Sequence, residues 1–174
     1  KTVSDALGPI TVLFNHAGTI VIKPFLETTL EEWDRLMAIN VRSMFLVTRE
    51  VLPPMIAAGG GAIVCISSQA AHGWPDSAHY SASKAGMLGL VRTMALDLAA
   101  YDIRVNAVAP GATDTAQPRG GYSEEQLTEL VKALPIPRMG RPDEIAEAVV
   151  FLASPAASYI TGQALHVNGG GFMP

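Results

Sequence analysis

The sequence has 174 residues, a formal net charge of −4 at pH 7, 49% hydrophobic residues and 16% charged residues. Its 12 basic residues form no stripe of the kind that binds nucleic acid, and no apolar run approaches the roughly 18 residues of a membrane-spanning helix. The single cysteine, Cys65, excludes an internal disulfide, and the first residues resemble neither a signal nor a transit peptide, so we expect a cytoplasmic protein.

The chain begins with a predicted strand and a long predicted helix. Residues 10–14 form a short run of strand-forming residues after a Gly-Pro pair. Thr29 and Glu32 have the spacing of a capping box, which predicts that a helix starts there. We expect Pro53-Pro54 and the glycines at 59–61 to end this helix. One stripe of it carries residues at three- and four-residue steps: Trp33, Met37, Asn40, Met44, Val47 and Val51.

The rest of the chain continues the alternation of strands and helices. Strands are predicted at residues 62–66, 103–108 and 164–167, and helices at 79–100, 123–133 and 143–153. The segment 67–78 is predicted to be a loop, and the Gly- and Pro-rich segment 113–121 a mobile loop. This order indicates an α/β fold with right-handed crossovers and a parallel sheet covered by helices. Residues 1–174 are interpreted as a single domain, or part of one.

Tyr80 and Lys84 are the first candidates for chemistry. They lie four residues apart on a predicted helix and therefore share one face. A nearby ammonium group favours the phenolate, so such a pair can make tyrosine an acid or base near neutral pH. The spacing alone is more often a solvated helix face, and its weight comes from the surrounding motifs.

Several motifs occur together in the order of the short-chain dehydrogenase/reductase family, which the chain resembles from about residue 8 to residue 171. They are NHAG at 15–18, Asn40, IVCISS at 63–68, YSASKAG at 80–86, RVNAVAPG at 104–111 followed by Thr113 and Thr115, RPDE at 141–144, TG at 161–162 and VNGG at 167–170. The resemblance implies a Rossmann-like, doubly wound parallel sheet. It also implies an oxidoreductase that interconverts a secondary alcohol and a ketone by hydride transfer, with NAD or NADP as cofactor.

The resemblance assigns catalytic roles to four residues. Tyr80 would exchange the proton of the substrate oxygen, and Lys84 would lower the pKa of the tyrosine and hold the nicotinamide ribose. Asn40 would anchor a water that links Lys84 to solvent. A serine would hydrogen-bond the substrate oxygen: the family's usual spacing selects Ser67, whereas alignment of the preceding strand selects Ser68. We favour Ser68, because a loop absorbs a deletion more easily than a buried strand changes register.

The resemblance also implies a cofactor site. Its residues are Asn15, Ala17, Gly18, Tyr80, Lys84, Pro110, Gly111, Thr113 and Thr115. Gly111 would let the backbone approach the ligand closely. His16 replaces the commoner second asparagine of its motif, which leaves its role open. The histidines and Cys65 lack metal-ligand spacing, so no metal site is predicted.

One signature of the family has no counterpart in the sequence, namely the Gly-rich turn after its first strand that receives the cofactor pyrophosphate. We therefore expect strands 4 to 7 of the family sheet, with the first three βα units absent and residues 10–14 as a bare apolar edge. An N-terminal segment or fragment would complete the site. The alternative function is a catalytically silent fragment that acts as a folding or interaction module. The resemblance further implies a homo-oligomer, a dimer or tetramer, acting on a small-molecule alcohol or ketone.

Overall fold

A computed structural model describes residues 3–174 and shows a parallel four-stranded sheet. The strands are β1 Val12–Asn15, β2 Gly61–Ile66, β3 Ile103–Pro110 and β4 Ala164–Val167, in the order β1-β2-β3-β4. All three neighbouring pairs are parallel. The predicted parallel α/β fold is therefore confirmed, and each strand begins and ends within two residues of its predicted position.

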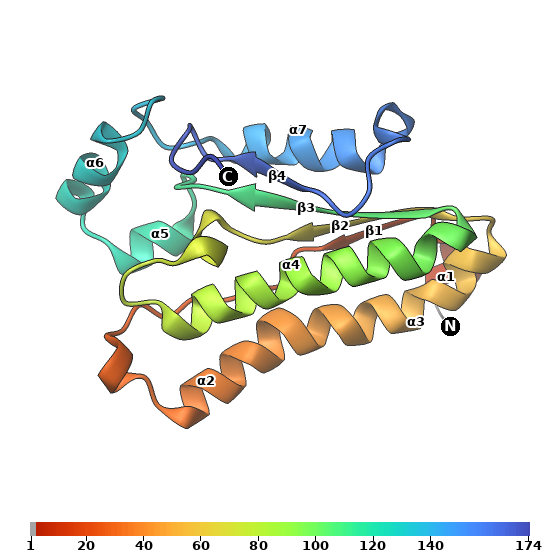
Figure 1. The fold of residues 1–174 in the computed structure, drawn as a ribbon, viewed down its shortest axis with the longest axis horizontal. Coiled ribbons are helices and arrows are strands. Elements are labelled where there is room, and N and C mark those ends of the chain that lie inside the picture. The colour runs from red at the N-terminus through yellow and green to blue at the C-terminus, as the bar shows by residue number, and fades with distance from the viewer. Residues whose placement is uncertain (1–2) are drawn as a thin grey trace.

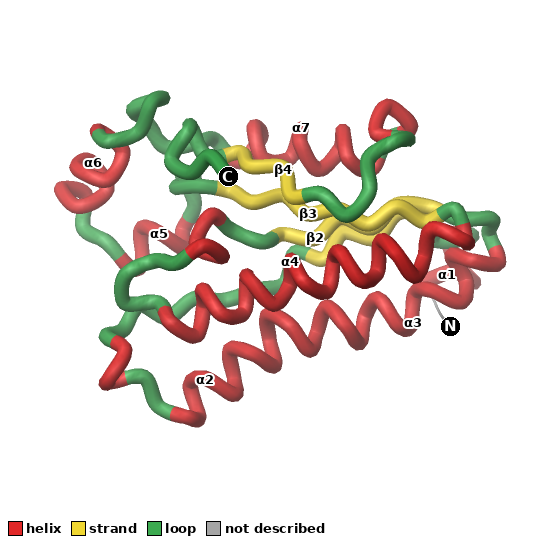
Figure 2. The backbone as a smooth tube through the Cα atoms, viewed as in Figure 1, coloured by secondary structure: helices red, strands yellow, loops and turns green. Residues whose placement is uncertain are grey.

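Helices cover both faces of this sheet (Figure 1). The helices are α1 Val3–Leu7, α2 Leu30–Met37, α3 Ser43–Ala57, α4 Ala78–Leu98, α5 Ala116–Gly121, α6 Glu124–Lys132 and α7 Pro142–Ala153. Figure 2 shows α3 and α4 side by side on one face and α7 on the other, while α5 and α6 lie beyond the carboxyl ends of the strands. Within the described residues, no helix is long and apolar enough to cross a membrane.

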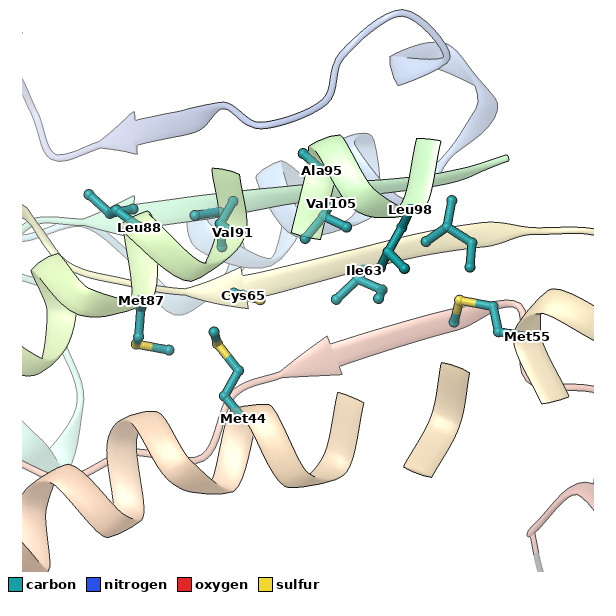
Figure 3. Packing of buried hydrophobic residues seen from close by; sticks show 12 residues of the cluster. Met44, Met55, Ile63, Cys65, Met87, Leu88, Val91, Ala95, Leu98 and Val105 are labelled. Carbon is teal, nitrogen blue, oxygen red and sulfur yellow. The ribbon is translucent and has the colours of Figure 1, made fainter. Parts of the chain in front are cut away.

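The core lies mainly between the sheet and the pair α3 and α4 (Figure 3). Met44 from α3 and Met87 from α4 point toward Cys65 of β2, and all three side chains are buried. The preceding residue of β2, Val64, faces the opposite side and packs in a cluster with Leu152 of α7. This alternation matches the two-residue period of a strand. Because both faces of β2 and β3 are buried, each strand holds its carboxyl end rigidly at the edge of the sheet where the candidate site lies.

The long helix departs from the expected stripe because it contains a π-turn. A π-helical segment, Ala38–Arg42, separates α2 from α3. The extra residue in this turn shifts the helix face that follows. Asn40 and Met44 are buried, as the stripe predicts, but Thr48 is buried in place of Val47, which is 45% exposed.

Two other local expectations were only partly right. Pro53 and Pro54 do not end α3, which continues to Ala57 and ends just before the expected glycines at 59–61. The carbonyls of Pro54 and Met55 still accept hydrogen bonds from Ala58 and Gly60, so the last turn forms without the two missing N–H groups. The predicted loop 67–78 likewise contains a 3-10 helix, Gln69–His72.

The segment 113–121, expected to be a mobile loop, contains α5. Arg119 of this short helix pairs with Asp114 before it and Glu124 after it. These ion pairs tie the Gly- and Pro-rich segment together against its compositional preference for a loop. The capping boxes predicted from sequence are confirmed at Thr29 with Glu32, and α6 starts with the box formed by Ser123 and Gln126.

Candidate active site

A cleft of about 350 Å³ lies at the carboxyl ends of the strands. It is bounded by the segments that follow β1, β2 and β3, by α4, by α7, and by α5 and α6, which together are called the lid. Such an edge is where open α/β sheets bind ligands. The cleft brings together most of the predicted site residues: Gly18, Ser67, Ser68, Tyr80, Lys84, Pro110, Gly111, Thr113 and Thr115.

Tyr80 and Lys84 share one face of α4, as predicted, and both are buried, at 7% and 3% exposure. The ammonium nitrogen of Lys84 lies 5.6 Å from the centroid of the Tyr80 ring and donates a hydrogen bond to the carbonyl of Ile66, at 2.8 Å. Burial lowers the pKa of Lys84 to about 8, although an electrostatic interaction with Cys65 acts to raise this pKa. Burial raises the pKa of Tyr80, while hydrogen bonding with Ser68 and Gln117 lowers it.

The two candidate serines point in different directions because they follow each other at the end of a strand. The hydroxyl of Ser67 is buried and donates to the backbone carbonyl of Lys84, at 3.0 Å. The hydroxyl of Ser68 accepts from the amide of Ala70 and lies in the cleft with Tyr80, whose pKa it lowers. Ser67 therefore fastens α4 to the strand end, whereas Ser68 lies beside the candidate acid.

Asn40 is fully buried in the π-turn and is held by groups outside its own helix. Its Oδ1 accepts from the amide of Thr19 at 2.8 Å, and its Nδ2 donates to the Thr19 carbonyl and to the Ser83 hydroxyl. A Cβ placed on Gly18 would lie 3.4 Å from both Asn40 Oδ1 and Lys84 Nζ. Asn40 thus fixes the Gly18-Thr19 segment against Lys84.

The other residues of the NHAG motif are divided between the core and the cleft. The amide of Asn15 is turned inward, where it donates to the hydroxyl of Thr48 at 3.0 Å and to the sulfur of Cys65 at 3.8 Å. Gly18 and His16 line the cleft, whereas Asn15 and Ala17 are not among its lining residues. The residue that departs from the family's commoner sequence therefore faces the site.

The Pro110–Thr115 segment lines the cleft after β3, but its glycine has a packing role. A Cβ on Gly111 would lie 2.8 Å from the Cα of Asn168, and the Gly111 amide donates to the Val167 carbonyl at 3.0 Å. Close approach of two backbones thus requires a glycine at this position. The hydroxyl of Thr113 donates to the carbonyl of Gly111.

Sequence reasoning missed Gln117 and the contact between Trp74 and Tyr122. The indole N–H of Trp74 donates to the hydroxyl of Tyr122 at 2.8 Å, which joins the loop after β2 to the end of α5. Gly121 is packed so closely against Ile22 that a Cβ would lie 2.6 Å from its Cδ1. The lid therefore contacts two walls of the cleft, the loop after β2 and the segment after β1. The only signal for Gln117 was its place two residues beyond Thr115.

Comparison with known proteins identifies the family. A family model described as enoyl-(acyl carrier protein) reductase matches residues 1–171. The 3-oxoacyl-(acyl-carrier-protein) reductase FabG of Vibrio cholerae is 38% identical over 174 residues, covering 99% of this chain and 71% of that protein. The chain belongs to the short-chain dehydrogenase/reductase family. FabG of Thermotoga maritima is 40% identical over 171 residues, covering 98% of the chain and 69% of that protein.

Solved structures agree with this membership of the short-chain dehydrogenase/reductase family. A 7 alpha-hydroxysteroid dehydrogenase complexed with NADH and 7-oxo glycochenodeoxycholic acid has a TM-score of 0.92 and 40% identity, with 98% of this chain and 67% of that chain covered. A gluconate 5-dehydrogenase from Burkholderia cenocepacia J2315, in complex with NADP and tartrate, has a TM-score of 0.91 and 35% identity, with 96% and 66% covered. The chain spans about two thirds of the length of these structural relatives.

Proposed function

We propose that the protein is an NAD(P)-dependent oxidoreductase that interconverts a secondary alcohol and a ketone, with Tyr80 as the acid and base. The observation that carries this proposal is the position of Tyr80 in the cleft, with Ser68 beside its hydroxyl and the Lys84 ammonium 5.6 Å from its ring. Membership of a family of dehydrogenases and reductases supports the same reaction.

The proposed reaction balances with one hydride and one proton. In ketone reduction, a bound reduced nicotinamide would supply the hydride for the carbonyl carbon. Tyr80 gives its hydroxyl proton to the oxygen, and Ser68 donates a hydrogen bond to that oxygen. The positive charge of Lys84 stabilises the phenolate that remains, which solvent then reprotonates. Alcohol oxidation runs through the same groups in reverse.

The residues of the cleft suit such a cofactor. An ammonium group has three N–H donors, and within the described residues the one hydrogen-bond acceptor of Lys84 is the Ile66 carbonyl. The other donors match the vicinal hydroxyls of a ribose. Gly18 leaves open space next to this nitrogen that a Cβ would fill. We therefore propose that Lys84, Tyr80 and Gly18 hold the nicotinamide end, together with Pro110, Gly111, Thr113 and Thr115, while Asn15 and Ala17 shape the segment before it.

NAD and NADP both remain proposed cofactors, because one similar structure is described with NADH and the other with NADP. Asn40 is proposed to position the Gly18-Thr19 segment and to serve the proton relay between Lys84 and solvent. The four strands are proposed to be strands 4 to 7 of the family sheet, which is supported by the NHAG, serine and Pro-Gly motifs at the ends of β1, β2 and β3.

A homo-oligomer is proposed as the working form. Apolar side chains are exposed on two of the helices and on the last strand, where a second copy would cover them. They are Phe45, Leu46 and Val47 on α3, Val150 and Phe151 on α7, and Leu165 on β4.

The test compares Tyr80→Phe with wild type, using the protein as its gene encodes it. Loss of the acid should lower kcat by about 10²- to 10⁴-fold with either NADH or NADPH. The matched control is Tyr101→Phe, at an exposed tyrosine beyond α4, which should keep full activity. Unchanged turnover in Tyr80→Phe would overturn the proposal, and a wild-type protein inactive with both cofactors would favour the silent module.

A further inference from the structure

We infer that the cleft takes an uncharged, mainly apolar ketone or secondary alcohol, and that Gln117 of the lid is a positioning residue beside the reacting oxygen. This inference rests on the proposed function and narrows its substrate class. The solved relatives pose the question directly, since one carries a bulky steroid in its description and the other a sugar acid in its name.

Among the described residues, the cleft offers no uncommitted lysine or arginine to the carboxylate of a substrate. Lys84 is the only Lys, Arg, Asp or Glu among the described residues that line the cleft, and its place beside Tyr80 commits it to the cofactor and the acid. The arginines of α5 and of the segment before α7 are paired with carboxylates: Arg119 with Asp114 and Glu124, Arg138 with Glu144, and Arg141 with Asp143. A sugar acid bound here would lack the forked arginine contact that carboxylates favour.

The walls of the substrate side are apolar. Ile20 and Ile22 come from the segment after β1, Trp74 from the loop after β2, and Tyr122 and Leu130 from the lid. The polar ends of Trp74 and Tyr122 bond to each other, which leaves their rings to contact the ligand. A polyol buried here would leave several hydroxyl groups without partners, at a cost of about 1–3 kcal/mol for each. An alicyclic or acyl skeleton has no such hydroxyl groups and avoids this cost on the same surface.

Gln117 supplies a polar contact at the place where the substrate oxygen must lie. It is the second residue of α5 and lines the same cleft as Tyr80 and Ser68. Its side chain lowers the pKa of Tyr80 and so favours the phenolate. Because it comes from the lid, it reaches this position when α5 lies across the cleft, and it therefore couples lid closure to the placing of Tyr80.

The first experiment tests the substrate class with two probes, trans-1-decalone and 5-keto-D-gluconate. With the preferred cofactor, kcat/KM for decalone should exceed that for the keto acid by at least tenfold. The reverse preference would overturn the inference and leave the proposed function standing.

Binding is measured independently by quenching of tryptophan fluorescence, with Trp74→Phe as the variant that should lose the signal. We expect decalone to quench the fluorescence at a lower concentration than the keto acid does. If decalone binds more tightly but neither compound is turned over, only the proposed function fails. Tighter binding of the keto acid would overturn the inference.

The second experiment tests Gln117 with Gln117→Leu, which keeps the size of the side chain and removes its hydrogen bonds. We expect kcat/KM for decalone to fall about tenfold, the effect of one lost hydrogen bond at a reacting group. In 1-decalol oxidation the rise of rate with pH should move to higher pH, because Gln117 no longer favours the phenolate of Tyr80. The matched control is Gln163→Leu, whose exposed side chain bonds to the Thr161 carbonyl away from the cleft. A pH profile and kcat/KM identical to those of this control would overturn the role of Gln117.

Discussion

Lys84 holds its ammonium nitrogen 5.6 Å from the centroid of the Tyr80 ring, one turn along the same helix. Both side chains are buried, so the surroundings oppose the charged form of each: the pKa of Lys84 falls to about 8 and that of Tyr80 rises. A charged lysine partly compensates a phenolate that burial would otherwise disfavour. The pair therefore works as a unit, and its pH dependence follows from the lysine as much as from the tyrosine.

The first prediction concerns the pH dependence of ketone reduction. Because the pKa of Lys84 is lowered to about 8, its ammonium is present below that pH and is lost as the pH rises through it. We expect kcat/KM to be flat up to about pH 8 and then to fall. Lys84→Met should lower kcat by about 10²-fold or more at neutral pH. Steady-state rates between pH 6.5 and 9.5 give the profile.

Lys84→Arg is the matched variant for this prediction. Its guanidinium stays charged throughout the range, so the fall near pH 8 should disappear even if the overall rate is lower. If Lys84→Arg showed the same break, the lysine would not be the group that titrates.

The second prediction separates the two serines. Ser68→Ala should reduce kcat by about 10²-fold through loss of a hydrogen bond to the substrate oxygen, with little change in stability. Ser67→Ala removes a buried hydrogen bond to the Lys84 carbonyl and should cost about 1 kcal/mol of unfolding free energy, with a much smaller effect on kcat. Urea unfolding and steady-state kinetics measure both quantities. Equal kinetic losses in the two variants would contradict the assignment of Ser68.

The third prediction concerns the amide that pins the segment after β1. Asn40→Ala leaves the amide and carbonyl of Thr19 and the hydroxyl of Ser83 without this partner, so we expect a loss of about 2–4 kcal/mol in unfolding free energy. Ser83→Ala removes only one of the three contacts and should cost about 1 kcal/mol. Chemical denaturation followed by circular dichroism compares them, and equal losses would show that the Thr19 contacts contribute little.

The sheet was predictable from sequence because its strands are short apolar runs bounded by Gly and Pro. The parallel order followed from the alternation with helices, and β4 was predicted to the residue. The family motifs then placed most of the site residues at one edge of the sheet. The π-turn at Ala38–Arg42 was not predictable, because a pattern analysis assumes 3.6 residues in every turn. The exposure of Val47 is the visible consequence.

The parts of the site that escaped prediction depend on side-chain direction and on ion pairs. Alignment left Ser67 and Ser68 open, and the direction in which each hydroxyl points now distinguishes them. The composition of the lid indicated a loop, whereas the two ion pairs of Arg119 accompany a helix. Gln117 enters the cleft from that helix, so no local pattern predicted its place.

The last prediction tests why Gly111 follows the strand end. A Cβ at this position would lie 2.8 Å from both the Cα and the Cβ of Asn168, where neither backbone can move without breaking the hydrogen bond between Gly111 and Val167. Gly111→Ala should therefore cost about 1–3 kcal/mol, the range found for overpacking, and should also raise KM because the segment lines the cleft. Gly140→Ala is the control, since its nearest contact would be an ordinary 3.7 Å and it lies beside the same segment. Thermal unfolding of the two variants compares their stabilities directly. If the glycine were needed only for the approach of a ligand, Gly111→Ala would be as stable as Gly140→Ala and would change KM alone.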